Sequence, residues 1–167
     1  MRRLLVSVAV AALLLGASTA HAAGKAGAPK WRGIPEGEAE AKKSGKPVLY
    51  FFTAEWCGPC HTIEREVFSD PKVAAAIEKR YVPVICEDTF RKQGVNPAGF
   101  EELAHRFGLR GFPTLVVARP GSRKGIRLEG WVGGDTTREF IDAAVSRLKE
   151  KEGESEGAKP KAAGGKP

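Results

Sequence analysis

Two cysteines separated by two residues carry the most evident chemistry in this sequence. They lie in Trp56-Cys57-Gly58-Pro59-Cys60, directly after the apolar run Val48–Phe52. A Cys-x-x-Cys pair serves either thiol–disulfide exchange or zinc binding, and a structural zinc site needs four ligands. The sequence offers no second such pair, and Cys86 is the one remaining cysteine. Together with the preceding strand pattern, this favours a redox-active pair and predicts no metal site.

The two sulfurs should differ in role because they occupy different places on the helix that begins at this motif. A thiolate is the attacking species in exchange, and the free N–H groups of a helix N-terminus favour negative charge. We therefore expect Cys57 to attack the substrate and Cys60, one turn further in, to resolve the mixed disulfide. Cys86 closes a strand pattern and is expected to be a buried free thiol, although an odd cysteine in a secreted protein can also pair between molecules.

Alternating helix and strand patterns surround the motif and predict one α/β domain over residues 31–148. Five segments have helical composition or periodicity, namely Glu36–Ser44, Cys60–Phe68, Lys72–Lys79, Ala98–Phe107 and Thr136–Leu148. Four read as strands, namely Val48–Thr53, Tyr81–Cys86, Thr114–Ala118 and Gly125–Leu128. The segment Glu87–Pro97 reads as a loop, and Pro83 indicates an edge or early strand position. This order predicts parallel strands joined by helices, followed by a terminal hairpin.

The N-terminal residues have the layout of a secretory signal peptide, which we place at residues 1–22. A basic start (Arg2, Arg3) is followed by an apolar stretch from Leu4 to Leu15 and by the small-residue cleavage pattern Ala20-His21-Ala22. The apolar stretch is shorter than the roughly 20 residues that a membrane-spanning helix needs. The sequence thus predicts a periplasmic or secreted protein in a compartment where disulfides form.

Two further segments are expected to lie outside the domain. Residues 23–30 read as a flexible linker, and residues 149–167 as a disordered C-terminal tail whose Lys/Glu start can extend the preceding helix. The net charge of +7 is spread along the chain, and residues 31–148 hold 18 basic against 16 acidic residues. A nucleic-acid partner is not expected, because such proteins concentrate their charge on the folded surface.

The cysteine motif and Gly111-Phe112-Pro113-Thr114, which precedes a strand, together resemble the thioredoxin superfamily. Trp31, Lys46-Pro47, Val67-Phe68 and Asp70 are similar to the secreted thioredoxin-like proteins grouped with the soluble thiol-reductase domain of DsbD. The resemblance spans about residues 31–148. It implies a thioredoxin-like fold, in which a central mixed β-sheet is flanked by helices on both faces.

The resemblance also implies a substrate-binding surface beside the cysteine pair. It implies a cis peptide bond between Phe112 and Pro113, against which an extended substrate segment would pair through its backbone. Trp56, Gly111, Phe112 and Pro113 are then expected to contact the substrate. Trp131 either joins this surface or packs in the core.

This sequence departs from cytosolic thioredoxin in two places. Phe51 stands where thioredoxin has a buried aspartate, so Glu55 is the nearest carboxylate that can assist proton transfer. The segment between Cys86 and the next helix is also longer than in thioredoxin. It either reshapes the substrate face or is a surface insertion.

These features predict an extracytoplasmic thiol–disulfide oxidoreductase that reduces or isomerises protein disulfides through Cys57 and Cys60. Gly58-Pro59 is the thioredoxin dipeptide, and this favours reduction over oxidation. We expect a monomer without a cofactor, acting on protein disulfide substrates and supplied with electrons by a membrane donor of the DsbD type. The alternatives are a non-catalytic binding module, as in a chaperone or metal carrier, and a dedicated reductase for cytochrome c maturation.

Overall fold

Strand β1 (Val48–Ala54) is the centre of the computed structural model, which describes residues 27–157. All seven residues of β1 are buried, as its nearly continuous apolar run predicts for a strand covered on both faces. The predicted signal peptide (1–22), residues 23–26 of the predicted linker and residues 158–167 of the predicted tail lie outside the described residues.

The strands form a four-stranded mixed sheet, as predicted, and their order in the sheet is β2-β1-β3-β4. Strand β2 (Val82–Asp88) runs parallel to β1. Strand β3 (Thr114–Ala118) runs antiparallel to both β1 and β4 (Gly125–Glu129), and so completes the predicted hairpin. Pro83 lies in the edge strand β2, where a missing N–H is tolerated.

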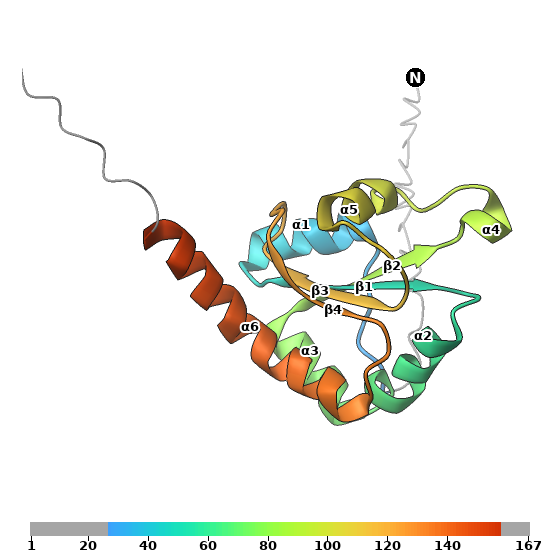
Figure 1. The fold of residues 1–167 in the computed structure, drawn as a ribbon, viewed down its shortest axis with the longest axis horizontal. Helices are drawn as coiled ribbons and strands as arrows, with labels where there is room; N and C mark the ends of the chain where they lie inside the picture. Colours follow the sequence, from blue (N-terminus) through green and yellow to red (C-terminus); the bar gives the residue numbers. More distant parts are fainter. Residues whose placement is uncertain (1–26, 158–167) are drawn as a thin grey trace, which may run out of the picture.

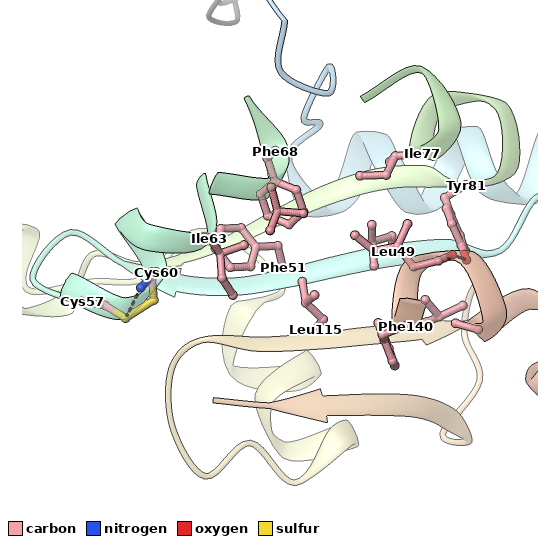
Figure 2. Close-up of a cluster of buried hydrophobic side chains, with 14 of the residues drawn as sticks. Leu49, Phe51, Cys57, Cys60, Ile63, Phe68, Ile77, Tyr81, Leu115 and Phe140 are labelled. Carbon is pink, nitrogen blue, oxygen red and sulfur yellow. Dashed lines mark hydrogen bonds between the residues drawn. A yellow bond between two sulfur atoms is a disulfide. The ribbon is translucent and has the colours of Figure 1, made fainter. Parts of the chain in front are cut away.

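Helices cover both faces of the sheet, so the predicted thioredoxin-like arrangement is confirmed (Figure 1). Helices α1 (Ile34–Ser44) and α5 (Phe100–Phe107) lie on one face, and α3 (Pro71–Arg80) and α6 (Gly134–Gly157) lie on the other. The alternation of side chains along β1 builds a core on each side. Tyr50 and Phe52 pack with α1 and α5, whereas Leu49 and Phe51 pack with α3 and α6 (Figure 2).

The helix that follows the cysteine motif differs from its prediction in its second half. It begins as α2 (Gly58–Ile63) and widens into a π-helical turn, η1 (Glu64–Phe68). The Ser69 N–H donates to the Glu64 carbonyl at 2.9 Å, and the wider turn leaves the adjacent Val67 and Phe68 both buried. Helix α3 then starts where it was predicted, with Pro71 in its first turn and the Asp70 carboxylate accepting the Lys72 N–H at 2.8 Å.

The segment Glu87–Pro97, predicted as a loop, begins with the last residues of β2 and then contains a short helix, α4 (Phe90–Gln93). Hydrogen bonds within the segment itself supply the reason. The Asp88 carboxylate accepts the Phe90 N–H at 2.9 Å, and the Thr89 carbonyl accepts the Gln93 N–H at 2.8 Å. Such local caps stabilise a single turn.

Helix α6 runs beyond its predicted end at Leu148 and continues to Gly157, so the Lys/Glu start of the predicted tail extends the preceding helix. Lys and Glu favour helix, and the Arg119 guanidinium pairs with Glu152 at 3.0 Å, which ties the extension to the β3–β4 loop. Within residues 27–157 we find no helix that combines the length and the apolar character needed to cross a bilayer.

A polar network between α1 and α5 lies over the outward end of the Tyr50 side chain. The Tyr50 hydroxyl donates to Glu38 at 2.8 Å, and Arg106 donates to the same carboxylate oxygen at 3.0 Å. Burial raises the pKa of Tyr50 far above its usual value, and the hydrogen bond to Glu38 adds to this shift. The network keeps polar groups satisfied where two helices meet above an apolar sheet.

Candidate active site

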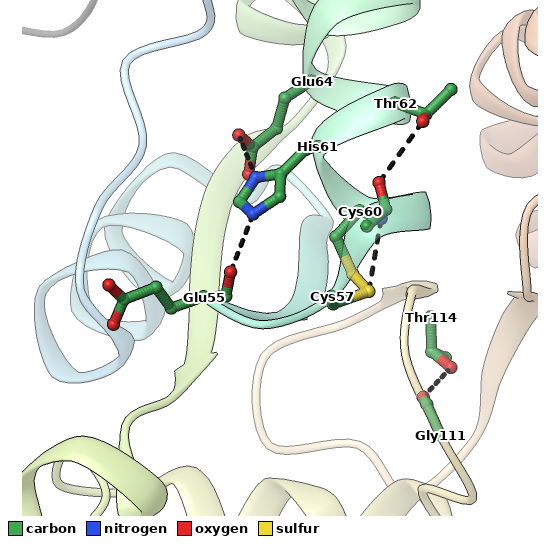
Figure 3. The surroundings of a disulfide bond; sticks show 9 residues. Glu55, Cys57, Cys60, His61, Thr62, Glu64, Gly111 and Thr114 are labelled. Carbon is green, nitrogen blue, oxygen red and sulfur yellow. Dashed lines mark hydrogen bonds and ion pairs between the residues drawn. A yellow bond between two sulfur atoms is a disulfide. The ribbon is translucent and has the colours of Figure 1, made fainter.

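Cys57 and Cys60 form a disulfide at the end of β1, where the strand turns into α2 (Figure 3). The Cys57 N–H donates to the Ala54 carbonyl at 3.0 Å and closes the turn that contains Glu55 and Trp56. Cys57 is the N-cap residue of α2, with Gly58 and Pro59 in the first turn. The strand and the helix therefore hold both sulfurs at one edge of the apolar cluster in Figure 2.

The two cysteines differ in exposure and in their contacts. Cys57 is 4% exposed, whereas Cys60 is fully buried. The Cys60 N–H donates to the Cys57 sulfur at 3.2 Å, a contact that would favour a thiolate on Cys57 after reduction. Cys57 is therefore the sulfur nearer to solvent, and Cys60 lies behind it.

The Gly111–Thr114 motif lies beside the disulfide, as Figure 3 shows. The Phe112–Pro113 peptide bond is cis. Gly111 is exposed, Phe112 is half-buried and Pro113 is buried. The Thr114 hydroxyl donates to the Gly111 carbonyl at 2.8 Å, and the Gly130 N–H donates to the Pro113 carbonyl at 2.8 Å. Both ends of the turn are thus held, while within residues 27–157 the backbone of Phe112 forms no hydrogen bond.

Trp56 connects the cysteine turn to the Gly111–Thr114 motif. Its side chain is 48% exposed, and its ring lies 5.7 Å from that of Phe112, nearly perpendicular to it. This edge-to-face contact forms an apolar surface next to Cys57. Of the predicted substrate-binding residues, Trp56, Gly111 and Phe112 remain accessible at this surface, while Pro113 supports it from below.

Trp131 is half-buried and packs against the cluster that contains the disulfide. Of the two roles considered for it, this contact supports packing.

Glu55 does not point at the disulfide. Its carboxylate is 61% exposed, pairs with Lys92 of α4 at 3.0 Å, and is directed away from the cysteines in Figure 3. In this geometry it has no contact through which to exchange a proton with either sulfur. The neighbouring His61 ring donates a hydrogen bond from Nε2 to the Glu55 carbonyl, 2.7 Å away, and its other nitrogen lies 3.6 Å from Glu64.

Cys86 lies on the opposite face of the sheet from the disulfide. It is fully buried in β2 within the cluster under α1 and α5. Burial raises the pKa of its thiol well above the usual range, and the nearby Glu38 carboxylate acts in the same direction. A buried neutral thiol of this kind is a poor nucleophile.

Sequence reasoning missed two residues of α4 that contact the cysteine turn. The Arg91 guanidinium lies over the Trp56 ring, 4.1 Å from its centroid, and Lys92 forms the ion pair with Glu55. Their only sequence signal was the length of the segment after Cys86. The structure thus favours the first of the two expectations for that segment, because it reshapes the surface beside the cysteine pair.

Curated relatives of this chain include thiol-exchange proteins. Over 111 residues it is 39% identical to the thiol:disulfide interchange protein DsbD 1 of Pseudomonas aeruginosa, covering 65% of this chain and 18% of that protein. It is 29% identical over 100 residues to the mitochondrial thioredoxin O1 of Arabidopsis thaliana, covering 60% of this chain and 44% of that protein. The chain therefore spans less than half the length of either relative.

Solved structures with the same fold include a thioredoxin and a domain of DsbD. A thioredoxin from Thermus thermophilus matches with a TM-score of 0.58 at 25% identity, covering 73% of this chain and 91% of that one. The reduced C-terminal domain of DsbD from Neisseria meningitidis matches with a TM-score of 0.51 at 24% identity, covering 66% and 91%, a likeness of fold.

The profile of the thioredoxin-like domain family matches residues 34–144, a range that includes all four strands, the cysteine pair and the Gly111–Thr114 motif. The chain therefore belongs to the thioredoxin-like domain family.

Proposed function

We propose that this protein is an extracytoplasmic thiol–disulfide oxidoreductase that reduces or isomerises disulfides of other proteins through Cys57 and Cys60. One observation carries the proposal: the two cysteines are bonded to each other at a strand-to-helix turn, beside an exposed aromatic surface. The relatives named as thiol:disulfide interchange proteins and thioredoxins support the same chemistry.

The reaction starts from the reduced pair. The Cys57 thiolate attacks one sulfur of a substrate disulfide, and the other substrate sulfur leaves as a thiolate and takes up a proton. Cys60 then loses its proton and attacks the Cys57 sulfur, which releases the second substrate thiol and forms the Cys57–Cys60 disulfide. Two electrons pass to the substrate, so each cycle needs a dithiol donor to reduce the pair again.

The free backbone of Phe112 supports a docking step before this exchange. An extended substrate segment could pair with the Phe112 N–H and carbonyl, which form no hydrogen bond within residues 27–157. Trp56 would cover the other side of the segment. Backbone pairing reads little side-chain identity, which suits an enzyme with several protein substrates.

The dipeptide between the cysteines supports the reducing direction. Thioredoxin, with Gly-Pro at this place, has a potential of about −270 mV, against about −120 mV for the oxidant DsbA. This difference of about 150 mV corresponds to roughly 7 kcal/mol for two electrons. The signal-peptide pattern in residues 1–22 supports a location outside the cytoplasm, where a membrane thiol donor of the DsbD type would supply electrons.

Insulin reduction in the presence of a slow dithiol donor tests this function. We expect the protein to accelerate precipitation of the insulin B chain, and Cys57→Ser to lower the rate to that of the donor alone. Cys86→Ala is the matched control, since it removes a cysteine on the other face of the sheet and should keep the activity. Full activity of Cys57→Ser would refute the proposal, and suppression of aggregation without turnover would favour a binding module instead.

A further inference from the structure

Residues 88–99, here called the α4 loop, form a compact unit next to the cysteine turn. The Asn96 carboxamide accepts the Thr89 N–H at 2.9 Å, and the Thr89 hydroxyl donates to the Val95 carbonyl at 2.7 Å. Asn96 also donates to Glu101 of α5 at 2.7 Å. These bonds join the two ends of the loop and attach it to the neighbouring helix, so it has a defined shape at the surface.

Two contacts fix the α4 loop beside the redox pair. Lys92 pairs with Glu55 at 3.0 Å, and the Arg91 guanidinium stacks 4.1 Å from the centre of the Trp56 ring. Glu55 and Trp56 are the residues directly before Cys57. The loop therefore places the Arg91 cation against the residue that directly precedes Cys57.

The charge of Arg91 is uncompensated, in contrast to that of Lys92. Within residues 27–157, no carboxylate lies at ion-pair distance from the Arg91 guanidinium. Stacking on an indole occupies the face of a guanidinium but leaves its N–H edge free, and that edge matches a carboxylate in shape and charge. Arg91 is thus preorganised to receive an acidic group of a bound substrate.

A groove continues from this position. It has a volume of about 570 Å³ and lies between the α4 loop and α5. Phe90, Phe100, Leu109 and Phe112 form the apolar part of its wall, and Asp88, Asn96, Glu101 and His105 form the polar part. Phe112 also contacts Trp56, so the groove opens beside the surface next to Cys57. The Phe90 side chain is 59% exposed at its rim. A substrate segment that leaves the redox pair in this direction meets first the Arg91 cation and then an open groove, part of whose wall is apolar.

We propose that the α4 loop selects substrates in which an acidic side chain lies near the reactive cysteine, with an apolar side chain further along. Arg91 binds the carboxylate and is the specificity-determining residue, while the groove holds the apolar side chain. This inference rests on the proposed oxidoreductase function and adds the class of substrate sequence that the site prefers.

Two disulfide-linked peptide substrates test the inference. They differ only in having Asp or Lys near one cysteine, and both have the same Leu further along. The full chain should reduce the Asp peptide about threefold more efficiently (kcat/KM) at low salt, the effect expected of an exposed ion pair. High salt should abolish the difference by screening. Arg91→Glu should reverse the preference, and Arg91→Lys should keep its direction, since the charge remains.

Arg123→Glu is the matched control, because it makes the same charge change in the β3–β4 loop, at the other end of the sheet from the disulfide. It should leave the preference for Asp unchanged. A preference that survives in Arg91→Glu, or that Arg123→Glu reverses equally, would overturn the inference.

Affinities of the same disulfide-linked peptides for the protein with its Cys57–Cys60 disulfide intact, which cannot attack them, separate this inference from the proposed function. They should follow the same order, Asp above Lys, because binding to Arg91 needs no electron transfer. Preferential binding without turnover would refute the oxidoreductase function and retain the α4 loop as a binding surface. Turnover of both peptides without any preference would refute the role of Arg91 alone.

Discussion

Cys57 and Cys60 share one disulfide but have different surroundings. Cys57 keeps a small contact with solvent, while Cys60 has none, and the Cys60 N–H donates to the Cys57 sulfur. A substrate sulfur can therefore approach Cys57 with little rearrangement, whereas reaching Cys60 requires α2 to move. We therefore expect the order of attack to follow from this difference in access rather than from the residue type.

The first prediction concerns this order. Cys60→Ser removes the resolving thiol and keeps the attacking one, so it should accumulate mixed disulfides with substrate proteins. Cys57→Ser should accumulate almost none, because Cys60 is fully buried. Non-reducing gels of extracts expressing each variant measure the complexes, with addition of a reductant as the control. Equal trapping by both variants would mean that the attacking cysteine is misassigned.

The second prediction concerns Cys86. Because its thiol is fully buried and remote from the disulfide, it should stay reduced and react with a maleimide only when the protein unfolds. Mass spectrometry after labelling with and without urea measures this. Cys86→Ala should lower the free energy of unfolding by about 1 kcal/mol through the lost sulfur contacts. A disulfide between Cys86 and Cys57 in the folded protein would contradict the assignment.

At the scale of elements, α1 packs unusually close to β2. A Cβ atom added at Gly37 would lie 2.2 Å from a methyl carbon of Val84 and 3.3 Å from the Cβ of Arg32. Helix interiors normally disfavour glycine by about 1 kcal/mol relative to alanine, so its presence here has a packing reason. The close approach lets α1 cover the edge-strand side of the core beside Tyr50.

The third prediction tests this packing with two glycine-to-alanine changes. Gly37→Ala should lower the free energy of unfolding by about 1–2 kcal/mol, because the overlap with Val84 outweighs the gain in helix propensity. Gly153→Ala in α6 is the matched control, since its new methyl group would meet nothing within 4 Å, and it should raise stability by up to about 1 kcal/mol. Urea unfolding measures both changes, and a stabilised Gly37→Ala would disprove the close packing.

For the molecule as a whole, two buried tyrosine hydroxyls and one buried thiol make the stability of the fold depend on pH in the alkaline range. Burial raises the pKa of Tyr81 to about 12, and it raises the pKa values of Tyr50 and Cys86 further. Each group stays protonated in the folded chain at a pH where the unfolded chain has lost that proton. The unfolded state then binds fewer protons, so stability falls as pH rises.

The fourth prediction follows from this sign. The contribution of Tyr81 should be fully present below its usual pKa of 10.0 and be lost as pH rises towards about 12. Between the usual pKa of such a group and its raised pKa in the folded chain, we expect the free energy of unfolding to fall by about 1.4 kcal/mol per pH unit. Urea unfolding at several pH values above about 9 measures the slope.

Tyr81→Phe provides the control for this slope. It should start less stable at neutral pH by about 1 kcal/mol, because the hydroxyl donates to the Ile141 carbonyl. Its stability should then decline less steeply at alkaline pH than that of the unchanged protein. An identical slope for both proteins would exclude Tyr81 as a contributor.

Features that depend on neighbouring residues could be predicted from the amino-acid sequence. The apolar run after Lys46-Pro47 identified the central strand, and Asp70-Pro71 identified the start of α3. The cysteine spacing and the Gly111–Thr114 motif identified the redox pair and its neighbouring turn. Side-chain periodicity, capping and short spacings are local properties, so they can be read before the chain is folded.

The arrangement of residues around the redox pair depends on the folded sheet and could not be predicted from the sequence. Arg91 reaches Trp56, and Lys92 pairs with Glu55, because β1 and β2 run parallel and their carboxyl ends meet at one edge of the sheet. The same pairing placed Cys86 on the face away from the disulfide, and the contact between Arg119 and Glu152 accompanies the longer α6. These contacts join residues far apart in the sequence, and no local pattern encodes which distant side chain will be opposite another once the sheet has formed.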